Sequence, residues 1–276
     1  MIDAPVLAVP RMRSLDRRQC LKMALGLAWA GPAVTTSAQS IKPRMKVGFI
    51  AHYQPYSFLQ ADGSLTGFDV EVVKALLDAS GFEMVPVTDS LTQLRKKLRD
   101  SEIDFIGNQL LRTPENRRQF DFVNSYATIQ LVTVLHEDDD RDFLSLENFL
   151  GKNLGVLSST GIDEQARGVL GKTVRGFERI EDALRALAER KLDAVLEENL
   201  IAEYFIERDE LPLKVGTPFA APIRAGLAVP KGNKNLENRL NEAVKNLVKA
   251  PRFKAISSRW FGYDVSRPLV SFATGV

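Results

Sequence analysis

The chain has 276 residues, which is enough for one large domain or two modest ones. Its composition, 45% hydrophobic and 26% charged, is that of an ordinary globular protein. The formal net charge is +2, and no basic stripe alternates with aromatic residues, so nothing indicates nucleic acid as a partner.

The first 38 residues have the pattern of an export signal. The pair Arg17-Arg18 precedes the apolar run from Met23 to Ala33, and small residues follow up to Ala38. The paired arginines resemble a twin-arginine signal, and the apolar run is too short to span a bilayer as a mature helix. We therefore expect a periplasmic protein whose signal is cleaved near Ala38. The alternative is an amphipathic first helix.

Removal of this signal would change the cysteine count and the net charge of the chain. Cys20, the only cysteine, would leave with residues 1–38, so the mature chain would have no disulfide. The segment holds five basic and two acidic residues, which leaves 32 basic and 33 acidic residues. The mature protein is therefore expected to be close to neutral, with a charge of −1.

From Lys46 to Ile106 the chain alternates short apolar runs with apolar stripes at helical spacing. Strands are expected at 46–50, 84–87 and 103–106, and helices around Val72–Leu77 and Leu91–Leu98. This β-α-β-α-β pattern is typical of a doubly wound α/β sheet, where ligands gather at the carboxyl ends of strands.

The last of these strands leads into a polar segment. Gly107-Asn108-Gln109 predicts a break, and Thr113-Pro114-Glu115 is a helix-start signal, with a capping residue, a proline and an acid. Arg117 and Arg118 follow. A strand end beside free helix N–H groups suits a small anion, whereas the alternative is an ordinary connection with solvated arginines.

A second series with a similar alternation of strands and helices follows, between the extended runs Ala127–Leu135 and Ala225–Val229. Its expected elements are a short capped helix at 145–151, strands at 154–157 and 192–196, and helices at 162–170 and 180–188. Glu198 lies at the carboxyl end of the second of these strands. The two halves therefore have one architecture without a close sequence repeat.

The residues that usually carry catalysis or bind metals are scarce. The chain has two histidines, His52 and His136, and no His/Asp/Glu spacing resembles a zinc site. Neither a nucleophile elbow nor a phosphate-binding glycine loop is present in the sequence. We therefore expect no cofactor and no enzyme activity. His136 adjoins an acidic run, and His52 is a candidate pocket residue beside Tyr53.

Three stretches resemble one family. Asp104 to Tyr126, DFIGNQLLRTPENRRQFDFVNSY, resembles a segment of the periplasmic solute-binding proteins for polar amino acids, extracellular solute-binding family 3. The loop Tyr53–Phe58 resembles the family's aromatic loop. The Asn108-Gln109 pair and the closing Trp260–Ser266 are most similar to the cystine-binding branch. The resemblance extends from about Lys46 to Asp264.

This resemblance implies a two-lobed α/β clamshell, each lobe a doubly wound sheet, joined by two crossing strands. Lobe one would comprise 39–129 plus 226–264, lobe two 130–225, and a tail 265–276. The implied function is the substrate-binding component of an ABC-type transporter for an amino acid or related small polar solute. The protein would be a monomer that serves a membrane permease. The alternatives are an enzyme on the same fold, similar to cyclohexadienyl dehydratase, and a sensing or interaction protein.

The resemblance also implies roles for single residues. Tyr53 and Tyr56 would stack on the ligand side chain, and Asn108 and Gln109 match the pair of the cystine-binding branch. Thr160 matches the hydroxyl that helps to bind the carboxylate. Glu198 matches the acid that binds the ammonium group.

One departure falls on the carboxylate-binding residue. Asn116 stands where the family has an arginine, and Leu111 stands where it has a threonine. Three explanations are open: Arg117 reaches into the site, Arg112 turns inward, or the ligand is not an ordinary α-amino acid. We favour the third, because two neighbouring positions changed together.

Overall fold

The computed structural model describes residues 42–158, 160–218 and 222–268. The expected signal, with its cleavage site near Ala38, and the last residues of the expected tail lie outside these ranges. In the described ranges, every helix is too short or too polar to cross a membrane.

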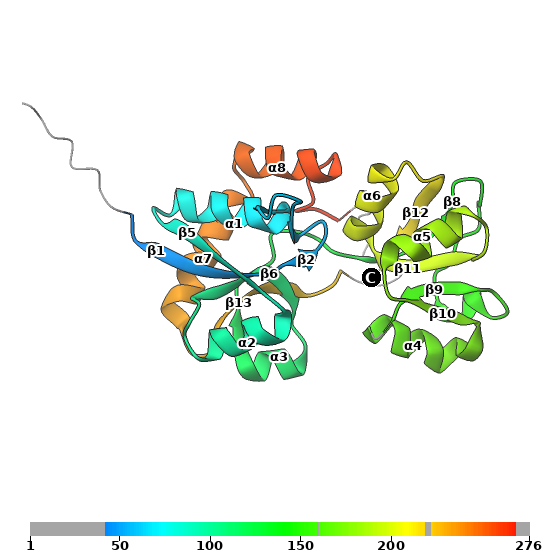
Figure 1. The fold of residues 1–276 in the computed structure, drawn as a ribbon, viewed down its shortest axis with the longest axis horizontal. Helices are drawn as coiled ribbons and strands as arrows, with labels where there is room; N and C mark the ends of the chain where they lie inside the picture. The colour runs from blue at the N-terminus through cyan, green and yellow to red at the C-terminus, as the bar shows by residue number, and fades with distance from the viewer. Residues whose placement is uncertain (1–41, 159, 219–221, 269–276) are drawn as a thin grey trace, which may run out of the picture. The chain divides into compact units, whose positions relative to one another are not determined.

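The first sheet has five strands in the order β5-β1-β6-β13-β7 (Figure 1). Their bounds are Glu83–Asp89 (β5), Arg44–Ile50 (β1), Phe105–Leu111 (β6), Ala225–Pro230 (β13) and Phe120–Phe122 (β7). β1 pairs in parallel with β5 and β6, and β13 pairs antiparallel with β6 and β7. A strand from late in the chain therefore lies inside a sheet that otherwise comes from the first half.

Helices cover both faces of this sheet. On one face α1 (Phe68–Ala79) packs against α7 (Lys234–Leu247) and α8 (Pro251–Phe261), and on the other lie α2 (Leu91–Arg99) and α3 (Pro114–Gln119) (Figure 1). Alternation along β1 fits this layering, because Val47 and Phe49 join the α1 core while Ile50 packs with Leu94 and Leu98. The expected β-α-β-α-β pattern is confirmed.

The second sheet has the order β10-β9-β11-β8-β12. Its strands are Val174–Phe177 (β10), Leu154–Leu157 (β9), Ala194–Glu198 (β11), Leu131–His136 (β8) and Leu213–Pro218 (β12). β9 pairs in parallel with β10 and β11, and β8 pairs antiparallel with β11 and β12. This is the pairing scheme of the first sheet, so the shared architecture of the two halves is confirmed.

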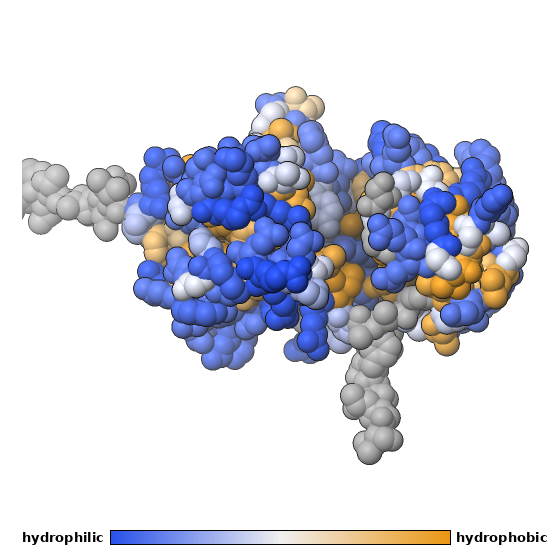
Figure 2. Space-filling model, turned by 90° about the horizontal axis from the view of Figure 1, so that it is seen from below, coloured by the Kyte–Doolittle hydropathy of each residue, from blue (hydrophilic) through white to orange (hydrophobic). Residues whose placement is uncertain are grey.

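Three α-helices and two 3₁₀ helices accompany the second sheet. They are α4 (Gly161–Leu170), α5 (Ile180–Ala188), α6 (Asn199–Arg208), η1 (Leu146–Phe149) and η2 (Gly171–Thr173). Hydrophilic residues cover most of the face in Figure 2. Among the described residues of the second lobe, three large hydrophobic side chains are exposed: Leu144, Leu150 and Val169. Most other apolar side chains are gathered in the cores.

Two segments join the sheets, 123–130 before β8 and 222–224 before β13 (Figure 1). They are bonded to each other, because the Ile223 N–H donates to the Ile129 carbonyl at 2.7 Å. The Thr128 N–H donates to the carbonyl of Val265, also at 2.7 Å. Val265 is fully buried. The packed chain therefore continues into the segment that was expected to be a tail from 265.

Some expected boundaries were wrong. Gly107-Asn108-Gln109 is not a break but lies inside β6, where the register is irregular: Ile106 and Gln109 pair with the successive residues Ala228 and Leu227. Such a bulge-like irregularity leaves residues of one strand without a paired residue opposite them while the strand continues. The expected strand from Ala127 begins only at Leu131, in β8.

Candidate functional site

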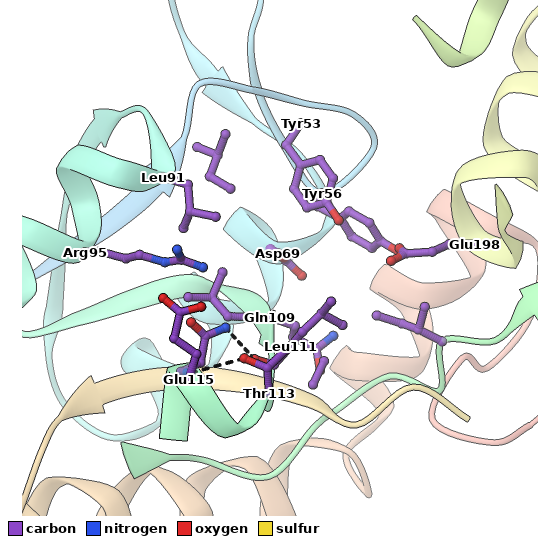
Figure 3. A pocket seen from close by; sticks show the side chains of 15 residues that line it. Tyr53, Tyr56, Asp69, Leu91, Arg95, Gln109, Leu111, Thr113, Glu115 and Glu198 are labelled. Carbon is purple, nitrogen blue, oxygen red and sulfur yellow. Dashed lines mark hydrogen bonds between the residues drawn. The ribbon is translucent and has the colours of Figure 1, made fainter. Parts of the chain in front are cut away.

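A cavity of about 440 Å³ lies at the carboxyl ends of β1 and β6 (Figure 3). Most of its wall comes from the first lobe, and Glu198, at the end of β11, adds a side chain from the second. The lining residues are Ile50, Tyr53, Tyr56, Asp69, Leu91, Arg95, Gln109, Leu110, Leu111, Thr113, Glu115, Asn116, Ile129, Glu198 and Ala225. The strand ends thus form the kind of site expected for this sheet type.

Two tyrosines project from a small three-stranded sheet. Its strands are His52–Tyr53 (β2), Ser57–Leu59 (β3) and Leu65–Thr66 (β4). The ring centroids of Tyr53 and Tyr56 lie 5.0 Å apart at an interplanar angle of 47°. Burial raises the pKa of both phenols well above the ordinary value, so both hydroxyls keep their protons and can donate hydrogen bonds.

Asn108 holds this small sheet in place. It is fully buried, its Oδ1 accepts the Ile50 N–H at 2.8 Å, and its Nδ2 donates to Ser57 Oγ and to Asp69 Oδ2, both at 2.9 Å. Tyr126 donates to the other oxygen of Asp69 at 2.5 Å. Burial raises the pKa of Asp69 to about 7. Asn108 therefore supports the loop behind the cavity wall, while Asp69 lines the cavity itself.

Glu198 is a carboxylate without a basic partner. The Tyr56 hydroxyl donates to its Oε2 at 3.2 Å, and no lysine, arginine or histidine in the described ranges forms an ion pair with it. Burial raises the pKa of Glu198 to about 7. Burial and the Glu198 charge raise the pKa of the adjacent Glu197 to about 8. A cationic group of a ligand would supply the missing charge partner.

Thr160 is not among the described residues that line the first cavity. It is the N-cap of α4, where its hydroxyl accepts the Asp163 N–H at 3.2 Å and donates to the Leu157 carbonyl at 2.8 Å. It lines a second cavity of about 450 Å³, which shares Tyr53 and Glu198 with the first. Thr160 therefore neighbours Glu198 through this second cavity.

Asn116 borders the first cavity but uses its amide locally. Its Nδ2 donates to the Leu111 carbonyl at 2.8 Å, and its backbone N–H donates to Thr113 Oγ1, so the expected helix start is confirmed. Arg117 is exposed, and its Nε donates to the Arg112 carbonyl at 3.0 Å. In the described structure Arg117 is not among the residues that line the cavity.

Arg112 also points away from this cavity. Its Nε donates to the Ala225 carbonyl and its Nη2 to the Val123 carbonyl, both at 2.8 Å. It lines a separate cavity beside the segments that join the sheets. Neither arginine considered from the sequence therefore supplies charge to the first cavity.

Arg95 was not predicted as a site residue from the sequence. It lies in α2, and Figure 3 shows its side chain directed into the cavity. The segment LTQLRKKLR looks like a solvated basic helix. One signal was available, because Arg95 stands four residues after Leu91 and therefore shares a helix face with it.

The described residues contain no cluster of three or more His, Cys, Asp or Glu that could hold a metal ion. His52 is exposed and lines a different cavity, together with Tyr53 and Glu197. The first cavity thus offers tyrosines, carboxylates, amides and one guanidinium, a set suited to binding a small polar molecule by hydrogen bonds and charge.

Comparison with known proteins agrees with this geometry. Residues 45–263 match the family described as bacterial extracellular solute-binding proteins, family 3. An L-cystine-binding protein of Escherichia coli K12 is 28% identical over 222 residues, covering 80% of this chain and 84% of that protein. An arginine-binding extracellular protein of Bacillus subtilis 168 is 27% identical over 231 residues, covering 82% and 89%.

A solved structure shows the same fold. The L-cystine solute receptor of Neisseria gonorrhoeae superposes with a TM-score of 0.70 at 24% identity, covering 83% of this chain and 96% of the receptor. The two-lobed α/β architecture is therefore common to both chains.

Proposed function

Because the chain belongs to the bacterial extracellular solute-binding proteins of family 3, we propose that it is the substrate-binding component of an ABC-type transporter. Its ligand is an amino acid or a related small polar molecule. The names of the two relatives, which bind L-cystine and arginine, support this class of ligand. The protein works in the periplasm as a monomer, after loss of residues 1–38, and delivers its ligand to a membrane permease.

The observation that carries this proposal is the position of Glu198. It brings an uncompensated carboxylate from the second lobe into a cavity whose wall otherwise comes from the first lobe and from Ile129 of a joining segment. An ammonium group bound there would contact both lobes through Glu198 and the tyrosines. Charge-assisted bonds of this kind are strong where water is excluded.

Ligand binding would then be coupled to a movement of the lobes. A ligand that contacts both lobes favours the conformation in which both sets of contacts are made, by as much as its affinities for the two conformations differ. The segments 123–130 and 222–224 are the natural hinge, because in the described chain they lie on the connections from β7 to β8 and from β12 to β13, which link the two five-stranded sheets. We place the lobe boundaries at these segments.

An enzyme is the second candidate, and the observation that favours it is again Glu198. A carboxyl with a pKa of about 7 is well suited to general acid-base catalysis. Turnover of a prephenate-type substrate would support this candidate, and binding of an amino acid without turnover would support the transport function.

A thermal-shift screen tests the proposed function. The mature chain from residue 39 is heated with single amino acids, L-cystine, opines and small organic acids. A ligand at a hundred times its Kd adds about 2.7 kcal/mol to the free energy of unfolding, which raises the midpoint measurably. We expect an amino acid or a close relative to give the shift. No shift with any amino acid would contradict the proposal.

A further inference from the structure

Arg95 carries a positive charge into the cavity without a partner. Its Nε–H is buried and donates to no acceptor of the described chain, and Arg95 forms no ion pair there. The Nε of Arg95 loses its hydration in this position without gaining a hydrogen bond from the described chain. Buried N–H groups in native proteins are normally satisfied, so the Arg95 Nε needs a hydrogen-bond acceptor, supplied by water or by a ligand.

Two acids of the same cavity do not satisfy it. Asp69 is committed to Tyr126 and Asn108 through both of its oxygens. Glu115 also lines the cavity, yet it is exposed to solvent and forms no ion pair with Arg95. The guanidinium is therefore available to a ligand.

Gln109 provides a second, independent donor. Its side chain is only 8% exposed and lines the same cavity. Its Oε1 accepts from Ser125 Oγ, whereas its Nε2 has no partner in the described structure. Two unsatisfied N–H donors in one cavity call for an acceptor, and a carboxylate can accept from both.

The charges around the cavity are arranged on two sides. Figure 3 shows Arg95 entering from α2 and Glu198 entering from the opposite side, where it meets Tyr56. Among the described lining residues Arg95 is the only basic one. A ligand with a positive and a negative group would match both sides.

We propose that Arg95, assisted by Gln109 Nε2, binds the carboxylate of a zwitterionic ligand whose ammonium group lies at Glu198. The inference rests on the proposed function and refines it. The charge that Asn116 lacks is supplied from α2, not from Arg112 or Arg117. Ligands without a carboxylate should therefore bind poorly.

The test uses pairs of probes that differ only in the carboxylate. L-cystine is compared with cystamine, and L-arginine with agmatine, by isothermal titration at low ionic strength. The mature wild type is measured beside Arg95→Gln. Arg99→Gln is the matched control, since Arg99 lies one turn further along the same helix and donates to Gln119 on the surface.

We expect the wild type to prefer the amino acid of at least one pair over its decarboxylated partner. Arg95→Gln should weaken binding of that amino acid roughly 30-fold or more and leave the decarboxylated partner unchanged. Arg99→Gln should change neither. Without ligand, Arg95→Gln should keep the thermal midpoint of the wild type, which separates loss of binding from misfolding.

The outcomes are distinguishable. If the wild type binds an amino acid and Arg95→Gln keeps the full preference for its carboxylate, this inference is overturned and the proposed function stands. If neither amino acid binds the wild type and the wider screen also finds none, the proposed function falls and the inference falls with it.

Discussion

Glu198 and Glu203 are two separate carboxylates in similar surroundings. Each accepts a hydrogen bond from a tyrosine, Tyr56 in one case and Tyr263 in the other, and burial raises each pKa to about 7. Of the two, only Glu198 lines the described cavity. We expect Glu198→Gln to weaken ligand binding by roughly 2–5 kcal/mol and Glu203→Gln to leave it unchanged, as measured by calorimetry. Equal losses in both variants would refute the assignment.

The raised pKa of Glu198 predicts how affinity depends on pH. Without ligand this pKa is about 7, and an ammonium group beside the carboxylate lowers it, so binding releases a proton below pH 7. Affinity for a cationic ligand should therefore increase as the pH rises from 5 to 8. Titrations in buffers of different ionisation enthalpy measure the proton release directly. Glu198→Gln should lose the increase in affinity that comes from ionisation of Glu198. A wild-type affinity that does not change between pH 5 and 8 would contradict the prediction.

Single residues were predictable where their role is local. Thr113 and Pro114 were identified as a helix start because capping needs only neighbours in sequence. Arg95 was not, because its role depends on which side of α2 faces a cavity formed by distant strands. The position of Asn108 behind the wall was equally hidden, since Ser57 and Asp69 come into contact with it only in the folded chain.

Among the structural elements, β13 has a close backbone contact at Gly226. A Cβ on Gly226 would lie 2.1 Å from the Val123 carbonyl oxygen, whereas a Cβ on Gly168, inside α4, would meet nothing within 4 Å. Gly226→Ala should therefore cost about 1–3 kcal/mol of unfolding free energy or more. Gly168→Ala should add roughly 0.5–1 kcal/mol, because alanine is the better helix former. Urea denaturation followed by circular dichroism compares them, and similar midpoints would contradict this account.

Elements with a clear apolar period were predicted well, and the others were not. The stripes of α1 and α5 and the run of β9 stand out in the sequence. α6 follows β11 directly, without a glycine or proline between them, so nothing in the sequence marks where the strand ends. β10 is a short edge strand with two exposed residues, and its pairing with β9 could not be seen locally.

On the scale of the whole molecule, the two lobes differ in how the chain builds them. Every strand of the second sheet lies between Leu131 and Pro218, whereas the first sheet needs β13 between β6 and β7. A fragment of residues 127–224 should therefore unfold cooperatively in urea. A fragment of residues 42–126 lacks β13 and should not. Cooperative unfolding of that second fragment would contradict the lobe assignment.

Arg112 has a mechanical consequence. Its guanidinium grips the carbonyl oxygens of Val123 and Ala225, the points where the two joining segments leave the first lobe. The hydrogen bonds of this one side chain thus fix the distance between the two joining segments at their first-lobe ends. The Asn124 N–H also donates to Asn241 in α7, so we expect the torsion of a lobe movement to fall on 125–130 and 222–224. If the second lobe moves by rotation about these two segments, successive ligands should meet Glu198 along the same arc.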